Sequence, residues 1–124
     1  MEGSAGFLEK IESLVEKNPD YKFEAYTFVL AGLHDTVSRL KKPRHISGQE
    51  LAWGISKYAL DQFGPMAMTV LRHWGIRTTL DLGKIVFALI DVKLLSKQPE
   101  DKLEDFDSVY DFAEVFSKYT INDE

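Results

Sequence analysis

Apolar residues recur mostly at helical spacing along this chain, and they predict five helices within its first 95 residues. The first helix is expected from Phe7 to about Lys17, with its apolar side chains three or four residues apart: Phe7, Leu8, Ile11, Leu14 and Val15. The pair Asn18-Pro19 ends it, because a residue before proline is disfavoured in the helical region. Residues 1–6 lack this pattern, so we expect a flexible N-terminus there.

A second helix is predicted from a cap at Asp20 to about Lys42, with Pro43 closing it. Its apolar residues form a heptad-like seam: Phe23, Tyr26, Leu30, Leu33, Val37 and Leu40. The seam either packs inside the molecule or forms a homodimer interface. The first interpretation is favoured, because Ala25, Phe28 and Val29 widen the apolar face beyond a coiled-coil stripe.

The third helix has the clearest signals at its ends. Ser47 and Glu50 have the spacing of a capping box, and Ile46, just before the cap, is placed to face Leu51. Gly64 is suited to the positive φ that ends a helix, and Pro65 to the first position of the next one. The side expected to be buried comprises Leu51, Ile55, Tyr58, Ala59 and Phe63.

A short fourth helix over Met66–Trp74 and a fifth helix capped by Thr78 or Thr79 are joined like a helix-turn-helix. Gly75 is expected to end the fourth helix, and Ile76 to make the apolar contact that follows such a glycine. The inward-facing residues predicted for these two helices are Val70, Leu71, Trp74, Leu82, Ile85, Val86, Leu89 and Ile90.

The C-terminal part has weaker patterns. Leu94–Lys97 is a possible short strand, and Val109–Phe116 is either the returning strand of a hairpin or a short helix. We therefore predict one mainly α domain over residues 1–124, with five helices, a winged-helix-like helix-turn-helix and a possible C-terminal β-hairpin. Its helical body covers residues 7–95, and an acidic C-terminal segment covers residues 96–124.

Composition restricts the class of protein. A length of 124 residues suits one domain with its own core, and the absence of cysteine excludes disulfides and thiolate metal sites. The acidic N-terminus resembles neither a signal peptide nor a membrane span, and the longest apolar run, Ile85–Ile90, is too short to cross a bilayer. We expect a cytoplasmic protein.

The charge is unevenly distributed. Residues 100–124 contain nine acidic residues and two lysines, whereas residues 1–99 have a net charge of +2. The acidic stretch Glu100–Glu114 is therefore expected either to be a solvated edge or to lie across basic residues of the body, around Arg39–Arg44 or at Arg72 and Arg77. The candidate interaction surface comprises Arg39, Lys41, Lys42, Arg44, His45, Glu104, Asp105, Asp107 and Asp111.

The helix-turn-helix pattern has poor chemistry for reading DNA. The fifth helix offers only Lys84 and Lys93, without arginine, asparagine or glutamine to contact base edges. The segment in the position of a wing, QPEDKLEDFD, is acidic and would be repelled by phosphates. Nucleic-acid binding is therefore expected to be unlikely.

Signals of catalysis are equally weak. His34, His45 and His73 are far apart in sequence and have no metal-ligand spacing, and only His45 is a site candidate. No glycine-rich phosphate loop is present, and the glycines inside helices, Gly32, Gly54 and Gly83, indicate close helix packing. We predict no catalytic residue, cofactor, metal or small-molecule ligand.

Four segments, RHISGQEL, YALDQFGPMAMTVLRHWGI, DLGKIVFALIDVKLLSK and the acidic DF…YDF ending, resemble a small family of uncharacterised bacterial proteins. The resemblance covers Tyr21 to Phe116, and its most specific part is QFGPMA at Gln62–Ala67. It implies a bacterial, cytosolic, single-domain protein, and it supplies no catalytic or binding residues. Lys93 stands where the family pattern has a glycine.

These observations together lead to one expectation about function. The leading hypothesis is a non-catalytic protein–protein interaction or regulatory module, with a protein partner or a second copy of the chain bound through the candidate surface. The alternatives are a winged-helix-like nucleic-acid-binding regulator and a small enzyme of unidentified type.

Overall fold

The fold is built from helices. A computed structural model describes residues 2–121, and the side chains of residues 6–116. Its elements are α1 (Glu2–Lys17), α2 (Phe23–Ser38), α3 (Gly48–Phe63), η1 (Gly64–Met66), α4 (Ala67–His73), α5 (Thr79–Asp91), η2 (Leu103–Phe106) and α6 (Phe112–Ile121). The mainly helical prediction is confirmed, and the five expected helices correspond to α1–α5.

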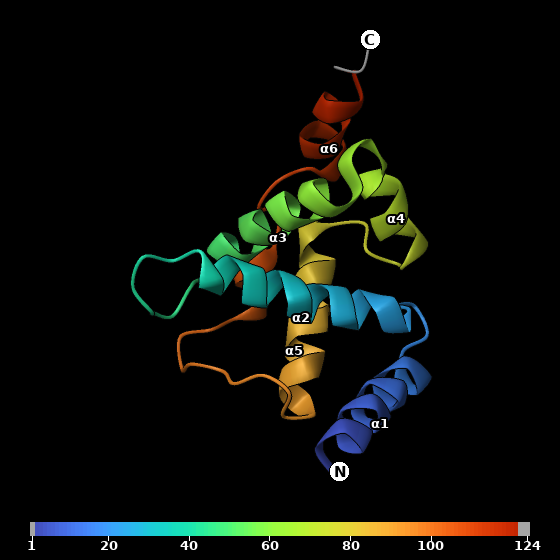
Figure 1. The fold of residues 1–124 in the computed structure, drawn as a ribbon, viewed down its shortest axis with the longest axis vertical. Helices are drawn as coiled ribbons and strands as arrows, with labels where there is room; N and C mark the ends of the chain where they lie inside the picture. The colour runs from blue at the N-terminus through green and yellow to red at the C-terminus, as the bar shows by residue number, and fades with distance from the viewer. Residues whose placement is uncertain (1, 122–124) are drawn as a thin grey trace.

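The helices cross one another around a single core. Helix α2 packs on α3 on one side and on α5 on the other, and α1 packs against α2 (Figure 1). Helix α5 also contacts η2, whereas α6 packs on α4 and η1 near the end of the molecule opposite α1 (Figure 1). The innermost side chains come from α1 to α5 and the turns between them: Ile11, Ala25, Val29, Ile55, Ala59, Leu71, Ile76, Leu82, Ile85 and Leu89.

Most of the expected helix ends are confirmed. Ser47 and Glu50 form the capping box of α3, and Ile46 and Leu51 beside it are both buried. Thr78, rather than Thr79, caps α5 through a second capping box with Asp81. These caps form because their side chains satisfy backbone N–H groups that have no partner in the first helical turn.

The junctions around α4 also follow the prediction. Gly64 has a φ of 53° at the end of α3, and Pro65 opens the next turn. Gly75 has a φ of 98°, and the N–H of the fully buried Ile76 bonds to the Leu71 carbonyl at 2.9 Å. This is a Schellman motif with its apolar contact, the usual way in which a glycine ends a helix.

Three predicted boundaries are wrong. Helix α1 begins at Glu2, so residues 2–6 belong to it, although they carry no large apolar side chains to mark a helix. Helix α2 begins after Lys22, because the turn from α1 continues through Tyr21, and it ends at Ser38 instead of Lys42. Pro43 disfavours a helical Lys42, and the chain leaves α2 through tighter bonds from Arg39 and Leu40 to carbonyls three residues earlier.

The seam of α2 is an internal packing face, as favoured from sequence. Phe23, Leu30 and Leu33 are partly buried against the core, but Val37 is 40% exposed. The most buried residues of the helix lie beside the strict stripe: Ala25, Tyr26, Phe28, Val29 and Gly32. The wide face results because α2 is covered on two sides, by α3 and by α5.

No residue of the described range 2–121 lies in a β-strand, so the possible C-terminal β-hairpin is absent there. The expected strand at Leu94–Lys97 is a turn, because Lys93, with a φ of 66°, closes a second Schellman motif at the end of α5. The second segment forms the short helix of the two alternatives, since α6 begins at Phe112. No helix in the described part of the chain is long and apolar enough to cross a membrane.

Candidate functional site

The basic turn, residues 39–45, joins α2 to α3 and contains five of the predicted site residues. Arg39 leaves the end of α2 and binds the Asp35 carboxylate at 2.9 Å and the Asp61 carboxylate of α3 at 3.6 Å. It therefore connects the two helices at the surface. Exposed pairs of this kind contribute little to stability, so Arg39 mainly fixes the start of the turn.

Arg44 at the other end of the basic turn is engaged with the capping box. Its guanidinium binds both oxygens of the Glu50 carboxylate, at 3.1 and 2.9 Å. This contact, together with the Ser47 backbone N–H, lowers the pKa of Glu50 to about 2. Glu50 is thus a structural group, not a proton donor near neutral pH.

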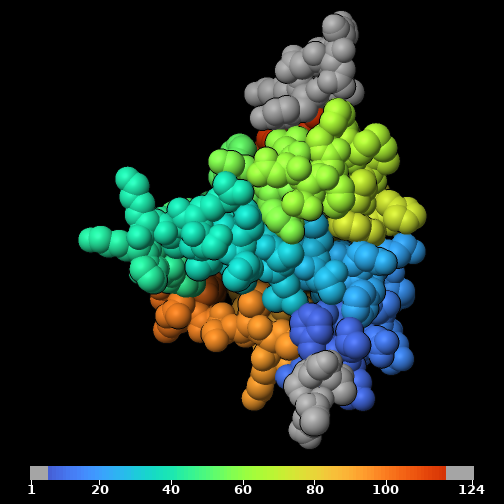
Figure 2. All heavy atoms as spheres, viewed as in Figure 1, coloured from blue at the N-terminus to red at the C-terminus, as the bar shows by residue number. Residues whose placement is uncertain are grey.

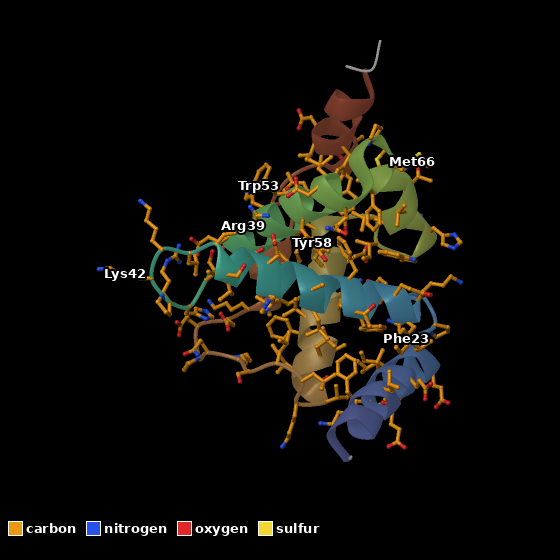
Figure 3. The ribbon with its side chains drawn as sticks, viewed as in Figure 1. Phe23, Arg39, Lys42, Trp53, Tyr58 and Met66 are labelled. Carbon is orange, nitrogen blue, oxygen red and sulfur yellow. The ribbon has the colours of Figure 1, made fainter. Side chains whose placement is uncertain are left out.

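Lys41 and Lys42 differ from these two arginines. Both are exposed, and neither ammonium group has a carboxylate within 4.0 Å among the described residues. Figure 3 shows Lys42 at the tip of the turn, pointing away from the body of the molecule. These two lysines form a small exposed basic patch that makes no ion pair within the described part of the chain.

The acidic stretch Glu100–Glu114 lies beside the basic turn at one place. His45 Nε2 is 2.9 Å from Asp101 Oδ1, and the two segments are neighbours in the space-filling view (Figure 2). Among the described residues, none of the arginines and lysines expected to meet the acidic stretch pairs with it; the contact is made by the adjacent His45 instead. The pair is an ion pair when the histidine is protonated.

Most of the predicted acidic residues have local structural roles. Asp105 accepts the Lys102 N–H at the start of η2, Asp111 accepts the Glu114 N–H at the start of α6, and Asp107 accepts from the Ser108 hydroxyl. Aspartates are common in such caps because the short side chain reaches back to the backbone. Glu104 is exposed.

Between the basic turn and the acidic stretch lies a pocket of about 230 Å³. Its floor consists of apolar side chains from α2, α3 and α5, among them Leu33, Leu51, Val86 and Ile90. Its mouth is polar and comes from the two loops, with Arg44, His45, Asp101, Lys102 and Asp105. This pocket combines predicted site residues from both charged segments, and we define it as the candidate functional site.

Phe106 holds the wall of this pocket in place. Its buried ring packs where Gly48 of α3 and Gly83 of α5 leave room, since a Cβ at either glycine would lie 3.0 Å or less from it. Its carbonyl accepts the Thr79 hydroxyl at 2.6 Å. The prediction that helix glycines mark close packing is confirmed here.

Groups suited to catalysis do not converge. His34 and His73 are exposed on α2 and α4, and no group of three His, Cys, Asp or Glu that could hold a metal occurs in the described part of the chain. Burial raises the pKa of Tyr21, which donates to Asp81, and the pKa of Tyr110, which donates to the Ala52 carbonyl. Both shifts oppose the ionised form that a tyrosine base needs.

The geometry of α5 also bears on nucleic-acid binding. Within this helix only Lys84 and Asp91 are exposed, because α2, α3 and η2 pack around it. A recognition helix enters the major groove with one open face. Helix α5 mainly forms the centre of the fold.

No protein-family model, curated protein sequence or solved structure matches this chain. The resemblance to a bacterial family therefore stays a prediction, and a function has to be argued from the site itself.

Sequence reasoning missed the pocket and the residues that shape it. The sequence predicts Thr79 only as an alternative cap, Leu95 as part of a possible strand and Phe106 as part of the acidic segment. The nearest signal in the sequence is the pair of glycines Gly48 and Gly83, because the Phe106 ring occupies the space that a Cβ at either position would take. Nothing local indicates which distant side chain fills such a space.

Proposed function

We propose that this protein is a non-catalytic interaction module that binds another protein through its basic turn and the neighbouring acidic stretch. The observation that carries the proposal is the exposed pair Lys41 and Lys42, which has no acidic partner among the described residues. The same turn meets the acidic stretch at the contact of His45 with Asp101. Adjacent patches of opposite sign steer and orient a partner with the complementary pattern. In this proposal α4 and α5, the helices of the predicted helix-turn-helix, serve as scaffold.

A site-specific photo-crosslinking experiment in the source organism tests the proposal. A photoreactive residue at Lys42 is expected to give a discrete adduct with one protein, and Lys41→Glu should reduce the adduct strongly. Lys10, exposed on α1, provides the control position. Equal adducts from Lys10 and Lys42, or none from Lys42, would contradict the proposal.

A second copy of the chain is the other candidate partner. Each copy presents both signs of charge, so a two-fold symmetric dimer could place each basic turn on the partner's acidic stretch. Sedimentation is then expected to show a dimer at low ionic strength, which dissociates at high salt. The Lys41→Glu/Lys42→Glu variant should be monomeric throughout; a monomeric parent protein under all conditions rules this candidate out.

Nucleic-acid binding through α5 and an unidentified small enzyme are weaker alternatives. The burial of α5 and the acidic stretch disfavour the first, and the lack of converging titratable groups disfavours the second. Salt-sensitive, micromolar binding to duplex DNA in a gel-shift titration would reverse this order.

A further inference from the structure

The pocket beneath the two charged loops is open to solvent although its floor is apolar. Ile46, Leu51 and Val86 line it and keep 8%, 5% and 7% of their surface exposed. Neighbouring core residues such as Ile55, Leu82 and Leu89 are at most 1% exposed. These three side chains therefore keep some solvent-exposed surface at the pocket, and an apolar group that entered would displace water from it.

Polar groups at the mouth are not equally available. Both carboxylates already accept hydrogen bonds: Asp101 from the Gln98 N–H and Asp105 from the Lys102 N–H. The Lys102 ammonium group, in contrast, has no carboxylate within 4.0 Å among the described residues. Arg44 and His45 are paired with Glu50 and Asp101, so within the described part of the chain the Lys102 ammonium group is the cation at the mouth that is free to bind a ligand's anionic group.

The volume limits the size of the apolar part. A dry cavity of about 150 Å³ lined by aliphatic and aromatic side chains accommodates benzene. The present pocket of about 230 Å³ has room for one ring and a short linker. It is smaller than the roughly 300–1,000 Å³ typical of sites for drug-sized ligands.

From the apolar floor, the free cation and the volume, we propose that this pocket binds a small amphipathic carboxylic acid, with one aromatic ring or a branched alkyl group of similar size. The apolar group lies between α2, α3 and α5, and the carboxylate lies at the mouth against Lys102. Binding of the apolar group and of the carboxylate does not require the protein partner proposed above. The ligand proposal and the partner proposal can therefore be tested separately.

The purified chain and one probe, 3-phenylpropionate, test the inference. In NMR titrations up to about 10 mM, which covers the millimolar affinity of ligands of this size, we expect saturable shifts at Ile46, Leu51 and Val86. The alcohol 3-phenylpropan-1-ol has the same ring without the charge, and it should bind about tenfold more weakly because it lacks the charge-assisted hydrogen bond.

Two variants and one control separate the apolar part from the charge. Lys102→Met should weaken the acid to the level of the alcohol and leave the alcohol unchanged, whereas Lys97→Met, on the same loop but outside the pocket lining, should change neither. Val37→Trp, at the exposed edge of the pocket, should block both ligands without lowering the melting temperature.

Three results would overturn the inference: no saturable shift at the pocket residues, equal affinity for the acid and the alcohol, or full acid binding by Lys102→Met. Because Lys102 is exposed, its replacement leaves the core intact, and the charge test stands even where Val37→Trp fails to fold.

Discussion

At the scale of single residues, backbone conformation and capping explain much of the chain. Lys93 closes the Schellman motif of α5 with a φ of 66°, a position that favours glycine because a Cβ is crowded there. The resemblance predicted from the sequence implies a glycine at this place, in agreement with the backbone conformation.

Replacing Lys93 with glycine is expected to raise the free energy of unfolding by about 0.5–1 kcal/mol, because relief of the left-handed strain exceeds the added flexibility of the unfolded chain. The matched control is Lys84→Gly, the same replacement at an exposed helical position of α5, which should lower it by about 1 kcal/mol. Urea denaturation measures both. A destabilised Lys93→Gly variant would show that the lysine side chain itself is needed.

Glu50 gives a pH-dependent prediction. The pKa of Glu50 is lowered from 4.5 to about 2, first by Arg44 and then by Ser47. A lowered folded-state pKa means that ionised Glu50 stabilises the fold above about pH 4.5, and that this contribution disappears as the pH falls from 4.5 towards 2. The carboxyl carbon of Glu50, followed by NMR, should titrate near pH 2, and in Arg44→Gln its midpoint should move towards 4.5. An ordinary midpoint in the parent protein would contradict the Arg44 contact.

At the scale of elements, the spacing of helices depends on small residues. Helices α2 and α3 approach so closely that a Cβ on Gly54 would overlap the Thr36 hydroxyl oxygen and lie 2.6 Å from Thr36 Cγ2. The sequence indicated close packing at this glycine, but not which helix approaches it.

The substitution Gly54→Ala should therefore destabilise the protein by about 1–3 kcal/mol through overpacking, in spite of the better helix propensity of alanine. The double variant Gly54→Ala/Thr36→Ala removes the two nearest atoms and should recover much of this loss. Gly6→Ala, where nothing lies within 4 Å, serves as the control. Strictly additive effects of the two replacements would disprove the contact, because touching residues are coupled.

At the scale of the whole molecule, a few long-range contacts attach the C-terminal part to the helical body. The Thr79 hydroxyl is buried; it donates to the Phe106 carbonyl and accepts the Val109 N–H at 3.1 Å. Tyr110 donates to the Ala52 carbonyl and packs against Trp53. These contacts position the acidic stretch, and with it one wall of the pocket.

Thr79→Val should lower the free energy of unfolding by about 2 kcal/mol, because it leaves buried backbone groups without partners. The amide of Val109 should also exchange faster with solvent. Thr79→Ser keeps the hydroxyl and should preserve the protection of Val109, which separates the hydrogen bonds from the lost methyl group. Unchanged exchange in Thr79→Val would show that the acidic stretch is held by packing alone.

The sequence by itself determined the local features of this protein. The capping box at Ser47, the glycine end at Gly75 and the apolar stripe of α5 could be predicted, because caps and helical periodicity depend on residues at most a few positions apart. The same local signals failed at the end of α2 and at Leu94–Lys97, where bonds to carbonyls three residues earlier and the left-handed Lys93 set the path of the chain.

Only the tertiary structure decided where the charged segments meet and what lies between them. The contact of His45 with Asp101 spans 56 positions, and the Phe106 ring fits between glycines of two different helices. Such pairings depend on the whole set of helix crossings, which no short pattern encodes. The pocket and its free Lys102 could therefore be found only once the helices were in place.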